Sequence, residues 1–401
     1  MRYWSSVSEK LPRALSRETS SGRFIPEMDG LRFAAIGMVV LFHLNGYLTV
    51  KSKLFYPVPP TDWLAQAAYV GFHGVELFFV ISGFILGLPF AAHHLKSKPV
   101  VPLRKYYLRR LTRLEPPYFV AAIGLFFLAI WIQKAEAHAL FPHLAASLSY
   151  LHNLMFAAQS SVIGVAWSLE IEVQFYVLVP LLTLLFAIKS KLARRLTLLL
   201  LIVAMIAVQA VFLHGSPRAS LSILAYLQFF LMGFLLADVF IVDWSENPSR
   251  NFYWDVFGMA SWPLLFLALH NPLLTHWLFP GLIFILYAAA FRGRILNRIF
   301  INRWITAIGG MCYSIYLIHY EVISAAGRFT RKISEGLPYW LHLGIQTFLV
   351  GGAILVICGL YFVLLEKPCM RRDWPQRFWK TMQRLFVAQR KTLENEAAKS
   401  S

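Results

Sequence analysis

Charged side chains are scarce in this sequence. Asp, Glu, Lys and Arg make up 14% of its 401 residues, whereas 58% of the residues are hydrophobic and the mean hydropathy is +0.58. A water-soluble protein of this composition would aggregate. Apolar runs of 17 or more residues recur from residue 31 to 365 with only short breaks, which indicates one membrane domain.

Cysteine and nucleotide-binding motifs are scarce as well. The three cysteines, Cys312, Cys358 and Cys369, provide neither a disulfide framework nor the ligand spacing of a zinc site. No GxxxxGKS, GxxxxGKT or GxGxxG motif occurs, which argues against a nucleoside triphosphate or dinucleotide site. Residues 1–27 lack the apolar core and cleavage site of a secretory signal, so we expect no part to be removed.

The apolar runs predict an all-α bundle of about ten transmembrane helices. We place them at residues 31–50, 69–90, 116–133, 164–188, 195–213, 221–241, 254–270, 274–291, 304–324 and 342–365. The net charge of +18 could indicate a nucleic-acid-binding protein. However, 30 of the 38 Lys and Arg residues fall in segments on the same side of the membrane as the N-terminus, and seven fall in segments on the opposite side. This asymmetry predicts that both termini are cytoplasmic.

Three segments lie outside these spans. Residues 1–28 are predicted to form a polar cytoplasmic segment, 29–366 the membrane domain, and 367–401 a basic tail. The tail is predicted to form an amphipathic helix that lies on the cytoplasmic leaflet or packs on the protein's own loops. Its apolar face comprises Trp374, Phe378, Trp379, Met382, Leu385 and Phe386, and its basic face Arg377, Lys380 and Arg384. Residues 141–156 are expected to lie in the third connection, partly re-entrant, or to form an eleventh span.

Ionisable residues inside the predicted spans are candidates for function. Each costs several kcal/mol in lipid unless it is paired or faces water. They are His43, Glu76, Glu170, Glu172, Asp238, His319 and Glu321, with Asp29 and Arg32 at the mouth of the first span. Arg32 and His43 are eleven residues apart and share one helical face, with His43 roughly 16 Å deeper. A hydrogen-bonded core histidine and a functional imidazole are both open readings of His43.

The fourth predicted span carries two carboxylates that cannot form a close pair. Glu170 and Glu172 point about 200° apart on a helix. Ser168, Glu172 and Tyr176 share one face, whereas Glu170 shares another with Gln174. At most one of the two acids therefore faces a given site, and both could instead pair with neighbouring helices.

Two further spans contain polar residues with alternative readings. Cys312, Tyr316 and His319 form one stripe of the ninth span, for which we favour hydrogen bonding between helices over a site. Glu76 in the second span precedes Gly83, a small residue that permits close helix packing. A structural role for Glu76 is as open as a functional one.

The second cytoplasmic connection gathers arginines just before a span. Arg109, Arg110 and Arg113 fall within five residues, and positive-inside topology explains part of this charge. Arg110 and Arg113 would lie side by side on a helical turn, where guanidinium groups suit phosphate oxygens. The sequence therefore predicts an anion site of open identity.

Together, and in this order along the chain, these motifs resemble the acyltransferase type 3 family of bacterial membrane acyltransferases. The matching segments are MDGLR with His43, GVELFFVISGF, RLTR, AWSLEIEVQFY, CYSIYLIHY and the closing EKP at residues 366–368. Glu172 corresponds to the family's glutamate, and Glu170 is an addition. The resemblance covers residues 29 to about 368, which is nearly the whole predicted membrane domain.

The resemblance implies a ten-helix enzyme of the bacterial cytoplasmic membrane that takes an acyl group, expected to be acetyl, from acyl-CoA. It implies no bound cofactor, and acceptors that are cell-surface or exported polysaccharides, their lipid-linked precursors or glycosylated small molecules. His43 would act as a general base or carry the acyl group. Arg32, Arg110 and Arg113 would hold the CoA phosphates, and Glu172 would orient a group or accept a hydrogen bond. Further candidates for the site are Asp29, Glu76, Ser168, Tyr176 and His319.

Hypotheses from other classes are kept beside this one. A proton-coupled transporter or exporter of a glycan or glycolipid is the alternative, because buried His and Glu residues also form proton relays. The sequence shows no clear internal duplication and no matched pair of broken helices, which are typical of many transporters. A structural or lipid-binding membrane component is a third hypothesis.

Overall fold

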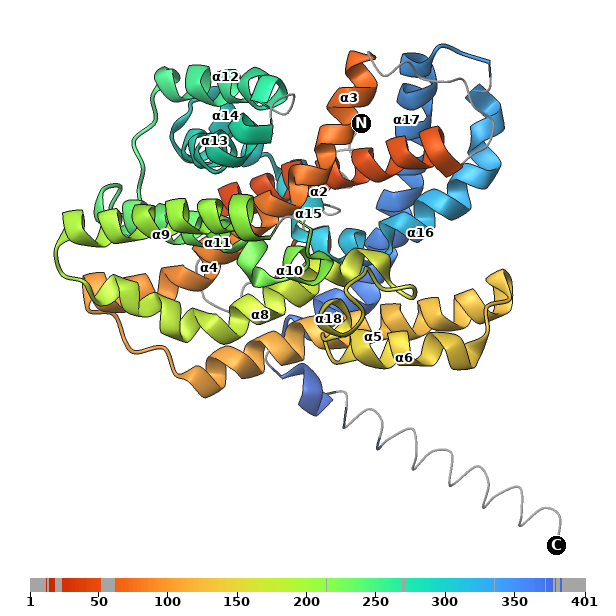
Figure 1. Ribbon diagram of the computed structural model, residues 1–401, viewed down its shortest axis with the longest axis horizontal. Coiled ribbons are helices and arrows are strands. Elements are labelled where there is room, and N and C mark those ends of the chain that lie inside the picture. Colours follow the sequence, from red (N-terminus) through yellow and green to blue (C-terminus); the bar gives the residue numbers. More distant parts are fainter. Residues whose placement is uncertain are drawn as a thin grey trace, which may run out of the picture.

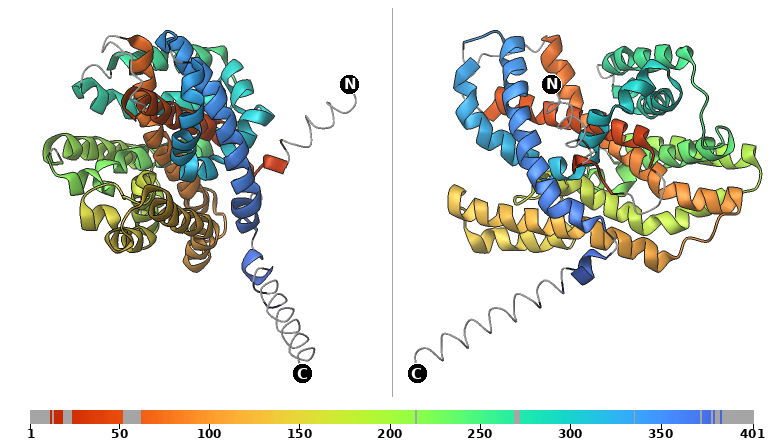
Figure 2. Two further views of the ribbon diagram at one scale, coloured as in Figure 1. Left: turned by 90° about the vertical axis from the view of Figure 1, so that its right-hand side faces the viewer. Right: turned by 180° about the vertical axis from the view of Figure 1, so that it is seen from behind.

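The computed structural model describes residues 12, 14–18, 24–51, 62–213, 215–268, 272–334, 336–371, 373–377, 379 and 383. Within these residues the protein is all-helical and contains no β-strand, as the apolar runs predict. The helices are α2 (Pro26–Gly46), α3 (Trp63–Tyr69), α4 (Gly74–Lys96), α5 (Leu103–Gln133), α6 (Ala137–Leu148), α7 (His152–Phe156), α8 (Trp167–Leu182), α9 (Lys191–Phe212), α10 (Pro217–Ser220), α11 (Leu227–Val242), α12 (Phe252–Ala268), α13 (Pro272–Arg292), α14 (Ile295–Phe300), α15 (Arg303–Gly310), α16 (Cys312–Thr330), α17 (Tyr339–Tyr361) and α18 (Lys367–Cys369). Short π-helical segments, η1 (Tyr47–Lys51) and η7 (Phe362–Glu366), extend α2 and α17. Figures 1 and 2 show the resulting bundle, with α12–α14 on one side and α5 and α6 on the opposite side.

The described helices support a multi-pass membrane protein. Six stretches are long and apolar enough to cross a membrane: Pro26–Val50, Trp63–Lys96, Leu103–Gln133, Gly164–Ala187, Lys191–Val211 and Tyr339–Cys369. Two shorter apolar helices are Leu227–Val242 and Trp277–Arg292. Each of these stretches overlaps one predicted span. The count of ten spans and the cytoplasmic position of both termini remain predictions.

The predicted span at 304–324 is interrupted. α15 ends at Gly310 and α16 begins at Cys312, with Met311 between them at φ −99° and ψ 16°. Gly309 and Gly310 precede this break, and consecutive glycines weaken a helix because they lose the most backbone freedom when it forms.

The arginine motif lies on a helix rather than in a loop. α5 begins at Leu103 and continues through Pro116 and Pro117, whereas the apolar run predicted a start at residue 116. The prediction was wrong because the helix extends into the polar, arginine-rich segment before the apolar run. The expectation that Arg110 and Arg113 lie on one helical turn is confirmed.

Residues 141–156 form α6 and α7 rather than an eleventh span. α6 has 12 residues, so it is about 18 Å long, and a bilayer core is about 30 Å thick. It packs against α5 (Figure 1). Most of the predicted amphipathic tail helix lies outside the described residues.

The centre of the bundle is built on close helix contacts. α2 crosses the middle of the molecule (Figure 1) and packs against α4, α15 and α16. α4 and α11 approach at Gly83, where an added Cβ would collide with the main-chain carbonyl of Phe230. Gly233 of α11 faces the main-chain carbonyl of Val80 in the same way. The prediction that Gly83 permits close packing is therefore confirmed.

Asp238, one of the ionisable residues in the predicted spans, forms ion pairs that join two helices. Asp238 of α11 is fully buried and accepts hydrogen bonds from Arg194 and from Arg195, the latter at 2.6 Å. Arg195 also pairs with Asp243 at 2.7 Å, and Lys191 bonds the same carboxylate. These pairs compensate the charges that join α9 to α11.

We expect Gly83→Ala to destabilise the protein by about 1–3 kcal/mol, because the new methyl group must push α4 away from α11. Thermal unfolding in detergent measures this effect. Gly352→Ala is the matched control, since Gly352 is exposed on α17 with nothing near its Cβ position, and it should be neutral or stabilising. Equal melting temperatures for the two variants would contradict the close α4–α11 contact.

The predicted topology can be tested at four exposed positions. In a cysteine-free background, single cysteines at Ser97 and Arg298 should be shielded from a membrane-impermeant maleimide added to intact cells. Cysteines at Glu136 and Lys332 should react with it. The opposite pattern at Ser97 and Arg298 would show that the number of spans before them is wrong.

Candidate active site

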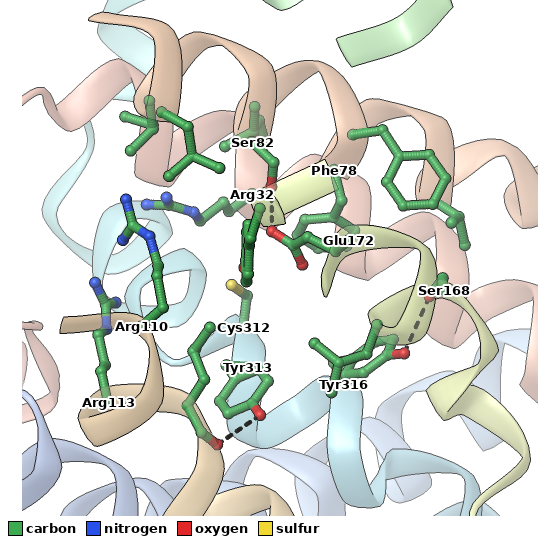
Figure 3. Close-up of a pocket in the computed structure, with 18 of the residues that line it drawn as sticks. Arg32, Phe78, Ser82, Arg110, Arg113, Ser168, Glu172, Cys312, Tyr313 and Tyr316 are labelled. Atoms are coloured by element: carbon green, nitrogen blue, oxygen red, sulfur yellow. Dashed lines mark hydrogen bonds between the residues drawn. The ribbon is translucent and has the colours of Figure 1, made fainter. Parts of the chain in front are cut away.

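Two cavities lie next to each other inside the bundle. The first, which we call the arginine cavity, has a volume of about 150 Å³ and contains four arginines in its wall. Figure 3 shows Arg110 and Arg113 at one end of this cavity and Ser168 and Tyr316 at the other. Its remaining polar lining residues are Arg17, Arg32, Ser82, Glu172, Tyr176, Cys312, Tyr313 and Glu366.

The second cavity contains His43, and we call it the histidine cavity. It is larger, at about 1350 Å³, and its wall combines aromatic and polar side chains. Among the lining residues are Tyr69, Phe72, Glu76, Trp167, Tyr226, Tyr320, Glu321, Arg328 and Arg331. Val75 lines both cavities, so the two spaces adjoin there.

The arginine cavity has an excess of positive charge. Its wall holds four arginines but two carboxylates, Glu172 and Glu366. The Nε atoms of Arg110 and Arg113 are buried and have no hydrogen-bond partner among the described residues. Arg110 stacks over Tyr106, with 5.3 Å from the guanidinium carbon to the ring centre. Buried, unsatisfied guanidinium N–H groups favour an anionic ligand in this cavity.

The carboxylates of this cavity are held from several helices. Glu172 of α8 accepts a hydrogen bond from Ser82 of α4 (Figure 3). Glu366 accepts from the Ser314 hydroxyl at 2.5 Å and from the Ser314 main-chain N–H at 3.0 Å. Both acids are therefore oriented before any ligand enters.

A tyrosine and a serine close the inner end of the arginine cavity. The Tyr316 hydroxyl donates to the carbonyl of Val165, because that carbonyl can only accept. The Ser168 hydroxyl, 3.0 Å from the Tyr316 oxygen, therefore donates to it (Figure 3). Since Val165 lines the histidine cavity, this chain of hydrogen bonds lies between the two cavities.

His43 forms a pair with His319. The Nδ1 of His43 lies 2.9 Å from the Nε2 of His319. The Nδ1 of His319 lies 2.8 Å from the carbonyl of Ile315 and 3.0 Å from that of Tyr316, so this nitrogen carries a proton. In the neutral pair the Nε2 of His319 must then accept the Nδ1–H of His43. The lone pair of His43 consequently resides on its Nε2.

The structure separates the predicted site residues into two groups. Arg32, Arg110, Arg113, Ser168, Glu172 and Tyr176 line the arginine cavity, whereas His43 and Glu76 line the histidine cavity. Glu172 and His43 therefore face different spaces. His319, for which hydrogen bonding between helices was favoured, does join two helices, but its partner is His43.

Three other predicted residues have defined contacts. Asp29 is 1% exposed and bonds both Arg32 and Arg17. Glu76 accepts a hydrogen bond from His73 Nδ1 at 3.2 Å. Glu170, the additional carboxylate, accepts from the main-chain N–H of Asn153 at 2.8 Å and so anchors α7.

Sequence reasoning missed Arg17. It precedes the first apolar run by more than ten residues, in a segment predicted to be a separate cytoplasmic region. No periodicity or motif connects it to the cavity that it lines.

The fold and the cavities define a multi-pass membrane protein with a buried cationic pocket beside a histidine pair. The chain belongs to the acyltransferase type 3 family, because that family's model, described as an acyltransferase domain, matches residues 25–364.

Curated relatives agree with this family. The chain is 26% identical over 388 residues to the O-acetyltransferase OatA of Staphylococcus aureus (strain NCTC 8325 / PS 47). The matched region covers 88% of this chain and 58% of the relative. It is also 26% identical over 392 residues to a Staphylococcus aureus (strain COL) protein whose name describes a candidate O-acetyltransferase, with 89% and 59% coverage. The chain therefore spans less than three fifths of the length of these relatives. No solved structure matches it.

Proposed function

We propose that this protein is an O-acetyltransferase of the bacterial cytoplasmic membrane that transfers an acetyl group from acetyl-CoA to a hydroxyl of a carbohydrate-containing acceptor. The observation that carries the proposal is the oriented His43–His319 pair. His43 lines the large cavity, and His319 bonds the main chain of Tyr316, which lines the cationic one. The family and the names of the relatives support O-acyl transfer. Acetyl-CoA and the acceptor class are our assignments.

Acyl-CoA suits the chemistry of the arginine cavity. It combines several phosphate groups at one end with a narrow arm that ends in a thioester. A space of about 150 Å³ is too small for the nucleotide, which would stay at the mouth of the cavity with the arm directed inward. Arg32, Arg110 and Arg113 would bind the phosphates at one end, while the thioester approaches Ser168 and Tyr316 at the other.

The histidine cavity suits a carbohydrate acceptor. Its volume of about 1350 Å³ exceeds that of the arginine cavity several-fold. Aromatic rings such as Trp167 and Tyr320 offer flat apolar surfaces for sugar rings, and Glu76 and Glu321 offer acceptors for sugar hydroxyls. The acceptor would be a cell-surface or exported polysaccharide or its lipid-linked precursor.

The histidine pair provides a general base. The Nε2 of His43 takes the proton of the acceptor hydroxyl as that oxygen attacks the thioester carbonyl. The carbon–sulfur bond then breaks, and the His43 imidazolium returns the proton to the departing thiolate, giving an acetyl ester and free CoA. A route in which Nε2 first takes the acetyl group uses the same nitrogen. In both routes His319 fixes the tautomer of His43, and Glu172 orients groups on the donor side.

Labelled acetyl-CoA with the purified protein and envelope glycans tests the proposal directly. An O-acetyltransferase leaves base-labile label on a glycan. Label that stays in acetyl-CoA, under conditions where the protein binds it, would overturn the assigned reaction.

For the donor, we expect Arg110→Gln combined with Arg113→Gln to raise the Kd for acetyl-CoA by about 10-fold or more, because each charge-assisted hydrogen bond contributes about 1.5–3 kcal/mol. Calorimetry or filter binding measures the change. Arg104→Gln is the control, since Arg104 is exposed on the same helix outside the cavity. Unchanged binding in the double variant would leave these arginines a role in topology alone.

For the base, we expect His43→Ala to lower kcat by about 10²- to 10⁴-fold with acetyl-CoA binding retained, because the proton acceptor is lost. His319→Ala should lower kcat by roughly 10- to 100-fold, the range seen when the partner that orients a metal-bound histidine is removed. His319→Gln should recover part of this loss, since its amide oxygen can accept the His43 proton. If His319 positions His43, His319→Ala should also change the pH profile of kcat. A purely structural role of His319 does not predict that change.

The protein contains its own control for these variants. His143 Nδ1 lies 2.8 Å from His152 Nε2, and His152 Nδ1 bonds the carbonyl of Ala158, so this pair has the same geometry away from both cavities. His143→Ala should leave kcat unchanged. More than about half of the wild-type kcat in His43→Ala would exclude His43 from the mechanism.

A further inference from the structure

The N-terminal segment is attached to the edge of the arginine cavity. We call residues 14–18 the strap; Figure 2 shows this part of the chain, in red, beside the end of α17. Lys367 donates to the carbonyl of Ala14 at 2.6 Å, and Arg371 pairs with Glu18 at 3.2 Å. Between these contacts, Leu15 packs against the hydrophobic core formed partly by α17. Both ends of the strap are thus held by the region that follows α17.

The strap directs one arginine into the cavity. Arg17 lines the same space as Arg32, Arg110 and Arg113, and its side chain is 9% exposed. Its Nε donates to Asp29 at 2.8 Å. Its backbone and Cβ lie on Gly310, within 3.4–3.7 Å of the position of a Cβ there, at the end of α15. The strap therefore closes this side of the cavity with a cation.

The charge on Arg17 is only partly compensated. Asp29 carries one negative charge and bonds both Arg17 and Arg32. Burial, and then the neighbouring Arg32 guanidinium, lower the pKa of Arg17 to about 9, so it stays protonated at neutral pH. A guanidinium has five N–H donors, so a bond to Asp29 leaves capacity for an anion.

We propose that Arg17 is a ligand of the donor phosphates, carried into the site by the strap. This inference rests on the proposed use of acetyl-CoA. The Nε–H of Arg17 remains on Asp29, and other N–H groups bind a phosphate that Arg110 and Arg113 contact from the opposite helix. The donor site is then built from the polar N-terminal segment as well as from the membrane domain.

Arg17→Gln tests this role. We expect the Kd for acetyl-CoA to rise about 10-fold or more, with kcat at saturating acetyl-CoA close to wild type, because the contact is present before and during transfer. Asp29 keeps Arg32 as its partner, so the fold should be retained. Arg104→Gln again serves as the control. A folded Arg17→Gln variant with wild-type Kd would overturn the proposal.

Arg17→Lys separates a ligand from a structural cation. Lysine keeps a positive charge beside Asp29 but replaces the planar group by a single ammonium. If Arg17 binds phosphate, the Kd should rise several-fold and the melting temperature should stay constant. A wild-type Kd in Arg17→Lys together with a destabilised Arg17→Gln would show that Arg17 serves Asp29 alone. If the Arg110 and Arg113 double variant also binds acetyl-CoA normally, the phosphates bind outside the arginine cavity. If the wild-type protein binds no acetyl-CoA, the proposed donor itself is wrong.

Discussion

The Asp29 carboxylate is the interaction on which both the packing and the cationic cavity depend. It is 1% exposed, and an unpaired carboxylate buried in this way would cost several kcal/mol. Arg32 and Arg17 compensate it, and one carboxylate thereby places two guanidinium groups at one cavity. The main-chain carbonyl of the same residue meets the Cβ position of Gly309, so α15 crosses α2 at this point with no room for a side chain. Loss of Asp29 would leave two buried cations without a counter-charge.

α2 fixes the positions of Arg32 and His43 relative to each other. Arg32 lines the arginine cavity, and His43, on the same face of α2, lines the histidine cavity. A rigid helix holds them roughly 16 Å apart along its axis. Under the proposed function, that separation would allow acetyl-CoA to bind through its phosphates at one end while its thioester reaches toward the other. Substitutions within α2 that alter its register would therefore affect the proposed donor site and the proposed base together.

Helical periodicity predicted the parts of the site that lie on single helices. Two sets assigned to shared faces, Arg110 with Arg113 and Ser168 with Glu172 and Tyr176, line one cavity. Arg32 and His43 were also assigned to one face, but they line different cavities. Contacts between distant segments gave no such signal. His43 and His319 are 276 residues apart, and Arg17 belongs to no amphipathic pattern. The continuation of α5 through two prolines also depends on tertiary packing, which outweighs local preference.

Tyr316 connects the hydrogen bonds between the two cavities to the histidine pair. Its hydroxyl bonds Val165 and Ser168, whereas its main-chain carbonyl accepts from His319. A change in the hydroxyl bonds of Tyr316 therefore need not disturb the main-chain carbonyl that orients His319. Under the proposed function, these hydrogen bonds would keep the thioester apart from the larger, more polar cavity and so limit hydrolysis of the donor by water.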